Sequence, residues 1–144
     1  MIKSDTIRLL RECDAGIKMG VASIDEVLDH VESPDLKQNL SACKREHQAL
    51  NTEIQRLLDK YQDGGKDPNP VAKSMFWVKT NMSLGMNESD QTIASLMTDG
   101  CNMGVKSLNK YLNQYEAADE VSKDIAKRLI HLEEQLVQEI RSYL

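Results

Sequence analysis

Residues 15–28 read AGIKMGVASIDEVL, and residues 99–112 repeat much of that stretch as DGCNMGVKSLNKYL. Chance alone would give about one identity over such a length. The identical positions, at an offset of 84 residues, are Gly16, Met19, Gly20, Val21, Ser23 and Leu28, which recur as Gly100, Met103, Gly104, Val105, Ser107 and Leu112. We therefore expect two similar helical hairpins, related by an approximate two-fold axis.

Apolar residues spaced three and four apart predict helices throughout the chain. Four long helices are expected at about residues 4–31, 34–62, 88–115 and 118–143, and a shorter one at about 70–82. Ser33-Pro34 and Asn69-Pro70 each supply a capping residue followed by a proline, which is tolerated at the first position of a helix. Residues 83–87 resemble a loop.

The link between the second and third long helices decides the topology. About 25 residues are enough to run back along a bundle of helices that each extend about 42 Å. The fold class is therefore expected to be all-α, a four-helix bundle in one domain, residues 1–144. Its long crossover would carry the short helix and cover one side of the bundle with Phe76 and Trp77.

Composition limits the classes of partner and compartment. The chain has 144 residues and a net charge of −5, with its basic residues scattered, so a nucleic-acid partner is not expected. No apolar run is long enough to cross a bilayer and no signal peptide is recognisable, so we expect a soluble, cytoplasmic protein. Cys13, Cys43 and Cys101 have no paired spacing and lie on or beside apolar stripes. They are interpreted as reduced core residues, with a redox or ligand role as the alternative.

Two repeated hairpins joined by a Trp-bearing crossover resemble the ferritin-like superfamily, with a rubrerythrin-like four-helix bundle. The pattern is similar to that of uncharacterised bacterial ferritin-like domains. In metal-binding members, the first and third helices each give a Glu, and the second and fourth each give a Glu-x-x-His motif, around two irons. Carried onto this chain, those positions fall at Lys18, Asn102, Lys44-x-x-His47 and Arg128-x-x-His131. Three cations and an amide in place of four carboxylates would repel Fe²⁺ or Mn²⁺.

The register of the last helix stays open at this point. An offset of 84 brings His131 opposite His47, whereas an offset of 85 or 86 brings Leu132 or Glu133 there. An altered metal site could then be assembled from candidate ligands on the second and last long helices: Glu46, His47, His131, Glu133 and Glu134. The simpler interpretation makes His47 a hydrogen-bonded core imidazole and leaves the others on a solvated face.

Glycines in the repeated stretches also need an explanation, because a glycine inside a helix costs about 1 kcal/mol relative to alanine. We expect the first and third long helices to approach each other closely there, with Met19 and Met103 alongside. A small apolar pocket, or a dimer contact, is the alternative. The helix-packing positions are Gly16, Gly20, Gly100 and Gly104.

No arrangement of residues in the sequence predicts an enzyme. The favoured function is a non-catalytic structural or protein-interaction module without a cofactor, acting as a homo-oligomer, most simply a dimer, or on a protein partner. The alternative is a metal-binding or oxidative-stress protein, with iron or manganese at an altered site around His47.

Overall fold

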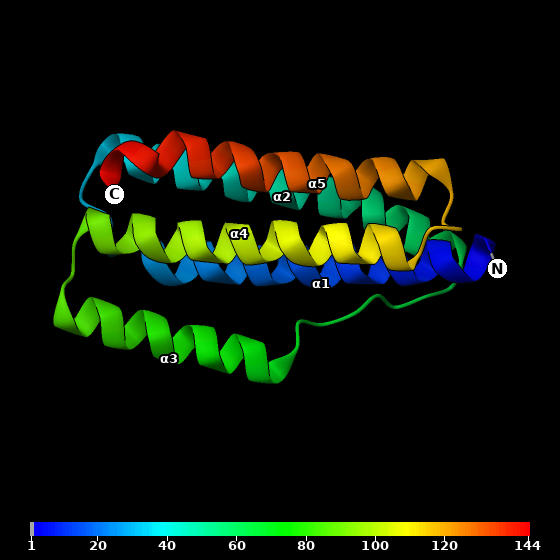
Figure 1. The fold of residues 1–144 in the computed structure, drawn as a ribbon, viewed down its shortest axis with the longest axis horizontal. Coiled ribbons are helices and arrows are strands. Elements are labelled where there is room, and N and C mark those ends of the chain that lie inside the picture. Colours follow the sequence, from blue (N-terminus) through cyan, green and yellow to red (C-terminus); the bar gives the residue numbers. More distant parts are fainter. Residues whose placement is uncertain (1) are drawn as a thin grey trace.

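A computed structural model describes residues 2–144, and within that range the chain forms helices and no strand. These residues form five α-helices, which pack together (Figure 1). The elements are α1 (Ile2–Leu28), α2 (Pro34–Lys60), α3 (Pro70–Met86), α4 (Asp90–Gln114), α5 (Glu120–Ile140) and a terminal 3₁₀ turn, η1 (Arg141–Tyr143). The prediction of an all-α fold with five helices is confirmed.

Four long helices form the body of the molecule. α1 packs antiparallel to α2, and α4 packs antiparallel to α5 (Figure 1). The two pairs meet through α2 against α5 and α1 against α4, and α1 also contacts α5 across the body. The capping residues form as the sequence predicts: the side chains of Ser33 and Asn69 accept hydrogen bonds from the first turns of α2 and α3.

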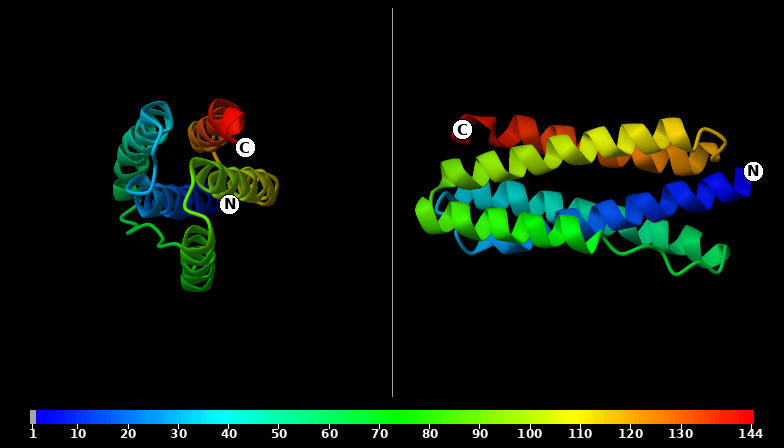
Figure 2. Two further views of the ribbon diagram at one scale, coloured as in Figure 1. Left: turned by 90° about the vertical axis from the view of Figure 1, so that its left-hand side faces the viewer. Right: turned by 60° about the horizontal axis from the view of Figure 1, so that its bottom comes forward.

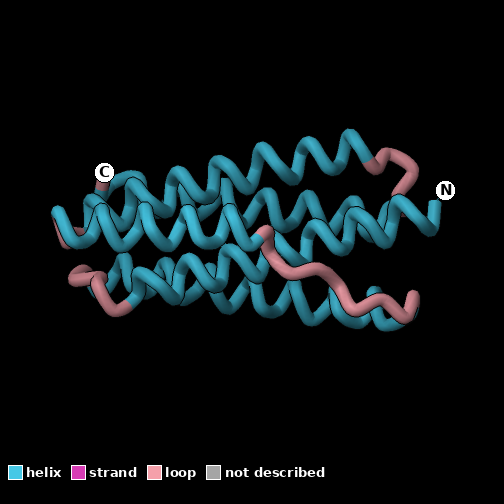
Figure 3. Tube along the Cα trace, turned by 90° about the horizontal axis from the view of Figure 1, so that it is seen from below, coloured by secondary structure: helices cyan, strands magenta, loops and turns pink. Residues whose placement is uncertain are grey.

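The connection from α2 to α4 runs back along the molecule, so that these two helices point in the same direction (Figure 1). An irregular segment follows α2 along the body, and α3 completes the return (Figure 3). α3 lies against α1 and α4 and projects from the four long helices (Figure 2). It continues to Met86, through the segment expected to be a loop.

Buried apolar side chains form two separate clusters along the body. One contains Leu9, Ile17, Ile54 and Leu129, among others. The other contains Ile24, Leu40, Ile93 and Leu136, among others. Since all four long helices contribute to both clusters, the region between the clusters lies near the middle of every helix.

Hydrogen bonds fasten the turns at both ends of the body. At one end, the Asp90 carboxylate accepts hydrogen bonds from the backbone N–H groups of Glu32 and Ser33, both at 2.9 Å. At the other, the backbone N–H of Asp119 donates to Thr6 Oγ1 at 2.9 Å. Each hairpin turn is thus held by a helix of the other hairpin.

Candidate functional site

A buried histidine and a buried glutamate face each other between the two apolar clusters. His47 of α2 is 1% exposed and Glu133 of α5 is 8% exposed. The Nε2 atom of His47 lies 3.2 Å from Oε1 of Glu133, and its Nδ1 atom lies 2.8 Å from the backbone oxygen of Cys43. Both ring nitrogens therefore face oxygen acceptors. This geometry favours the imidazolium ion, in which both nitrogens donate.

Electrostatics agree with that assignment. Burial disfavours the imidazolium, but hydrogen bonds with Cys43 and Glu133 outweigh the burial and raise the pKa of His47 from 6.5 to about 10. At neutral pH the site is then an ion pair, His47⁺ with Glu133⁻, whose polar atoms are largely satisfied inside the protein.

Local sequence explains why a polar pair is buried here. His47 lies on the same face of α2 as Leu40, Cys43, Leu50 and Ile54, all of which are buried. Glu133 likewise occupies a position in the buried stripe of α5. Each helix thus carries a polar residue in the middle of its buried stripe, where an apolar residue would be usual, and the bundle brings His47 and Glu133 together.

Two glycines lie against the pair, and Gly20 makes room for it. A Cβ atom added to Gly20 of α1 would lie 3.3 Å from the His47 ring, and one added to Gly104 of α4 would lie 3.5 Å from the Glu133 carboxylate. We call Gly20, His47, Gly104 and Glu133 the central polar layer. All four long helices contribute one residue to it.

The other two glycines have different neighbours. A Cβ atom on Gly16 would meet Leu129 of α5 at 4.0 Å, and one on Gly100 would meet Phe76 of α3 at 4.0 Å. Met103 is exposed rather than packed beside these positions. The four glycines thus face side chains of α2, α3 and α5, instead of bringing the backbones of α1 and α4 together.

Two cysteines border the central polar layer. The sulfur of Cys43 lies 3.4 Å from His47 Nδ1. Burial, followed by the negative charge of Glu133, raises the pKa of the Cys101 thiol. Burial also raises the pKa of Cys13, which lies on α1 outside the central polar layer, to about 12. All three cysteines are free and buried, and Cys13 and Cys101 stay protonated at neutral pH, which makes them poor nucleophiles.

Of the five metal-ligand candidates from the sequence, the structure brings together only His47 and Glu133. Glu46, His131 and Glu134 are exposed. The prediction that His131 shares the layer with His47 is wrong, because the two pairing residues are 86 positions apart instead of 84. The observed offset of 86 is one of the registers that the sequence left open.

The chain matches no protein-family model, no curated protein and no solved structure.

The positions carried over from metal-binding ferritin-like proteins do not line the central polar layer. Lys18 forms ion pairs with Asp14 at 3.0 Å and Asp67 at 3.3 Å, and Asn102 is exposed. The basic residues of the expected motifs are also paired on the outside: Lys44 with Asp25, and Arg128 with Glu53. The layer has glycines on α1 and α4 instead.

The donor set of the layer does not fit a di-metal centre. Such a centre uses four carboxylates and two histidines, whereas the layer has one imidazole and one carboxylate, already paired with each other. Across residues 2–144, no group of three or more His, Cys, Asp or Glu side chains is arranged to hold a metal ion. The arrangement can hold one proton between His47 of α2 and Glu133 of α5.

A second buried charge was missed at the sequence level. The Asp14 side chain is fully buried and accepts hydrogen bonds from Gln55 Nε2 at 2.7 Å and from the backbone N–H of Lys66 at 2.9 Å. Asp14 therefore holds the segment that follows α2 against α1. The signal was available, because Asp14 falls between Leu10 and Ile17 at spacings of four and three and so lies on the buried face of α1.

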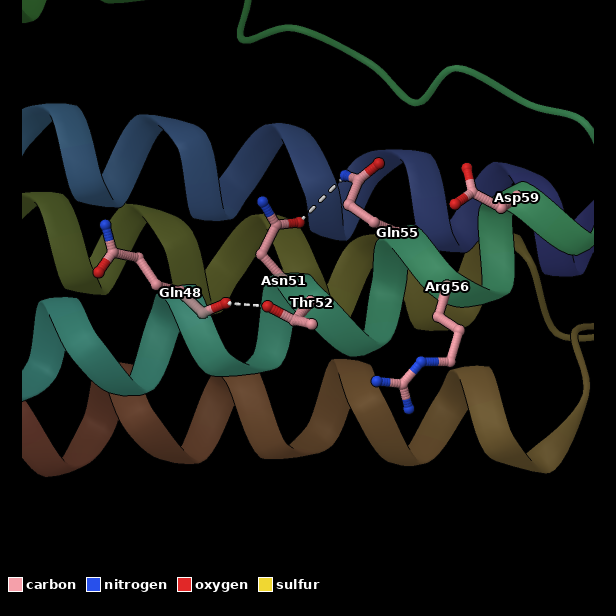
Figure 4. A pocket seen from close by; sticks show the side chains of 6 residues that line it. All are labelled: Gln48, Asn51, Thr52, Gln55, Arg56 and Asp59. Carbon is pink, nitrogen blue, oxygen red and sulfur yellow. Dashed lines mark hydrogen bonds between the residues drawn. The ribbon is translucent and has the colours of Figure 1, made fainter.

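The surface depressions of the described residues do not form a further candidate site. Figure 4 shows six polar side chains along one face of α2 that line a shallow depression, namely Gln48, Asn51, Thr52, Gln55, Arg56 and Asp59. No second element contributes a side chain to its lining, so it lacks the opposing wall that a ligand site needs. Among the described helices, none combines the length and the hydropathy required to cross a bilayer.

Proposed function

We propose that the chain is a non-catalytic ferritin-like bundle that acts as a structural or protein-interaction module. Two antiparallel helix pairs, α1 with α2 and α4 with α5, joined by a long crossover that makes α2 and α4 parallel, are consistent with the topology of ferritin-like folds. The two related stretches around Gly20 and Gly104 occupy corresponding places in the first helix of each pair, which supports the same proposal.

The composition of the central polar layer carries the non-catalytic part of the proposal. The carboxylate positions of metal-binding ferritin-like proteins fall at Lys18 and Asn102 in this chain, and the layer itself has Gly20 and Gly104 on the first and third long helices. His47 and Glu133 use their hydrogen-bonding capacity on each other and on the backbone. A polar pair satisfied in this way strengthens and orients a core but leaves no open position for a substrate.

The surface of α3 supports the interaction part. Five of its apolar side chains point away from the body and are between 47% and 86% exposed: Val71, Met75, Val78, Met82 and Met86. We call this set the α3 stripe. Contiguous apolar surface of this kind marks contact sites on soluble proteins.

Metal analysis of protein purified without chelators and then dialysed tests the proposal. We expect iron, manganese and zinc well below one equivalent per chain, in the wild type and in His47→Gln alike. One equivalent that resists dialysis and is lost in His47→Gln would overturn the non-catalytic assignment.

Such a result would favour the second candidate function, a metal-binding or oxidative-stress protein with an altered site around His47. The observation in its favour is that Cys43, next to His47, and Cys101, next to Glu133, border the same layer. Thiolates, imidazoles and carboxylates together form the usual ligand set for zinc. Cys43→Ser and Cys101→Ser should then lower metal content as His47→Gln does.

A further inference from the structure

α3 carries an apolar face that points away from the body. The members of the α3 stripe follow one another at spacings of four, three, four and four, which places them on one face of the helix. The opposite face packs on the body through Thr80 and Leu84, which are buried, and Phe76, which is half-buried. Figure 2 shows α3 standing out from the other helices, so its outer side is open along its length.

The spacing of the α3 stripe is also that of a coiled-coil seam. Val71, Met75, Val78 and Met82 fall at alternating spacings of four and three, the pattern that allows one helix to lie along another. α3 therefore resembles one half of a helix pair whose other half lies outside the chain.

Two polar side chains on the flanks of α3 are bound to the body. Lys79 Nζ pairs with Asp99 of α4 at 3.2 Å, and Asn81 Nδ2 donates to Glu26 of α1 at 3.2 Å. The stripe itself holds no charge. The stripe thus offers no charge to a strongly charged partner surface, whereas it complements an apolar helix.

Building on the function proposed above, we propose that the partner is a second copy of this chain, bound through antiparallel pairing of α3 with α3 about a two-fold axis. In that register, Val71 faces Met82 of the second copy, and Met75 faces its Val78. The two-fold axis repeats both contacts, so each of the four layers joins one valine to one methionine. In this register, no lysine of α3 lies opposite the same lysine in the α3 of the second copy.

The available area suits a reversible dimer. The four side chains that pair in this register expose on the order of 400 Å² per copy, so two copies can bury about 800 Å², which is in the range of weak, transient interfaces. An interface of this size is expected to give a monomer–dimer equilibrium rather than a permanent dimer.

Sedimentation equilibrium of the full chain tests the pairing. Protein concentrations of about 1 to 200 μM cover the range around the expected dissociation constant of about 10⁻⁵ M. We expect a concentration-dependent dimer, weakened about tenfold or more in Met75→Glu/Met82→Glu, because each substitution puts a carboxylate against an apolar layer. The control is Val121→Glu on α5, which introduces a carboxylate at an exposed valine away from α3 and should leave the equilibrium unchanged. A wild type that stays monomeric throughout, or a control that dissociates equally, overturns the proposal.

Disulfide cross-linking tests the antiparallel register, and circular dichroism first checks that each variant folds. Under mild oxidation, an equimolar mixture of Val71→Cys and Met82→Cys should cross-link efficiently, and either variant alone should not. Val71→Cys that cross-links to itself as well as the mixture does would overturn the antiparallel arrangement.

The two proposals fail separately. A monomeric wild type without stoichiometric metal overturns the dimer alone. A metal that His47→Gln removes overturns the non-catalytic function, whatever the oligomeric state.

Discussion

His47 shows how one residue can be buried and charged at once. Its two ring nitrogens point at a carboxylate and at a backbone carbonyl, so protonation supplies a donor to each acceptor. A neutral imidazole would leave one nitrogen facing an acceptor with no hydrogen between them, which is costly in a dry interior. The proton is therefore part of the folded structure.

We expect stability to fall as the pH rises above neutrality. The pKa of His47 is raised from 6.5 to about 10 in the folded state, so the native protein keeps a proton that the unfolded chain releases. Its contribution is complete below pH 6.5 and is lost as the pH approaches 10. In urea titrations between about pH 7 and pH 8.5, the free energy of unfolding should fall by about 1 kcal/mol per pH unit.

His47→Gln should flatten this dependence. His30→Gln should keep it, because His30 is partly exposed and bonds to the exposed Glu88. Ionisation of cysteines would add to the same trend above about pH 9, since burial raises the pKa of Cys13 and Cys101. An equal slope in the wild type and His47→Gln below pH 8.5 would contradict the charged assignment.

Gly65 is required by Asp14. Its φ angle is +82°, and a Cβ atom there would lie 2.3 Å from Asp14 Oδ2. Gly65→Ala should therefore lower the free energy of unfolding by about 2 kcal/mol or more, through backbone strain and disruption of the Asp14 hydrogen bonds. Gly64→Ala is the matched control: nothing lies within 4 Å of its Cβ position, and we expect a change near zero. Urea denaturation of both variants makes the comparison.

At the scale of the element, α1 combines good helix formers with two interior glycines that have different roles. Gly20 leaves space for the His47 ring, whereas the Cβ position of Gly16 is in ordinary contact with Leu129. Helix propensity alone would favour alanine at both positions.

We therefore expect opposite effects from the same substitution one turn apart. Gly16→Ala should stabilise the protein by about 0.5 to 1 kcal/mol, because it lowers the entropy of the unfolded chain and adds no clash. Gly20→Ala should destabilise it, because the His47 ring is fixed by two hydrogen bonds and cannot retreat from a Cβ atom at 3.3 Å. Thermal unfolding of the two variants measures both effects, and equal stabilisation would show that the ring is free to move.

Periodicity was sufficient to find the helices and their order, because each long helix has a continuous apolar stripe such as Leu36, Leu40 and Cys43 of α2. It could not orient α3. Val71, Met75 and Val78 have the same spacing as core residues, yet they face outward. Nor could it fix the partner of His47, since a shift of two residues along α5 exchanges exposed His131 for buried Glu133. Sequence periodicity shows that a helix has an apolar face, but it does not show which element packs against that face.

For the whole molecule, the central polar layer divides the core in two. One apolar cluster lies on each side of His47 and Glu133, and all four long helices cross between the clusters. A buried ion pair of this kind contributes little net stability, but removal of one partner leaves an uncompensated charge.

A double-mutant cycle should show this coupling. His47→Leu leaves the Glu133 carboxylate buried alone and should cost about 3 to 5 kcal/mol. His47→Leu/Glu133→Leu removes both charges and should recover most of that loss, because it joins the two clusters into one apolar core. Urea denaturation of the wild type, both single variants and the double variant measures the coupling energy. Additive effects would contradict direct pairing.

The single tryptophan of the chain gives the appended helix its own optical signal. Trp77 lies on α3, more than half exposed, whereas the four long helices contain none. Intrinsic emission therefore follows the surroundings of α3, while the far-ultraviolet dichroism is dominated by the other four helices. Comparing the two melting curves would show whether α3 leaves the body before the body itself unfolds.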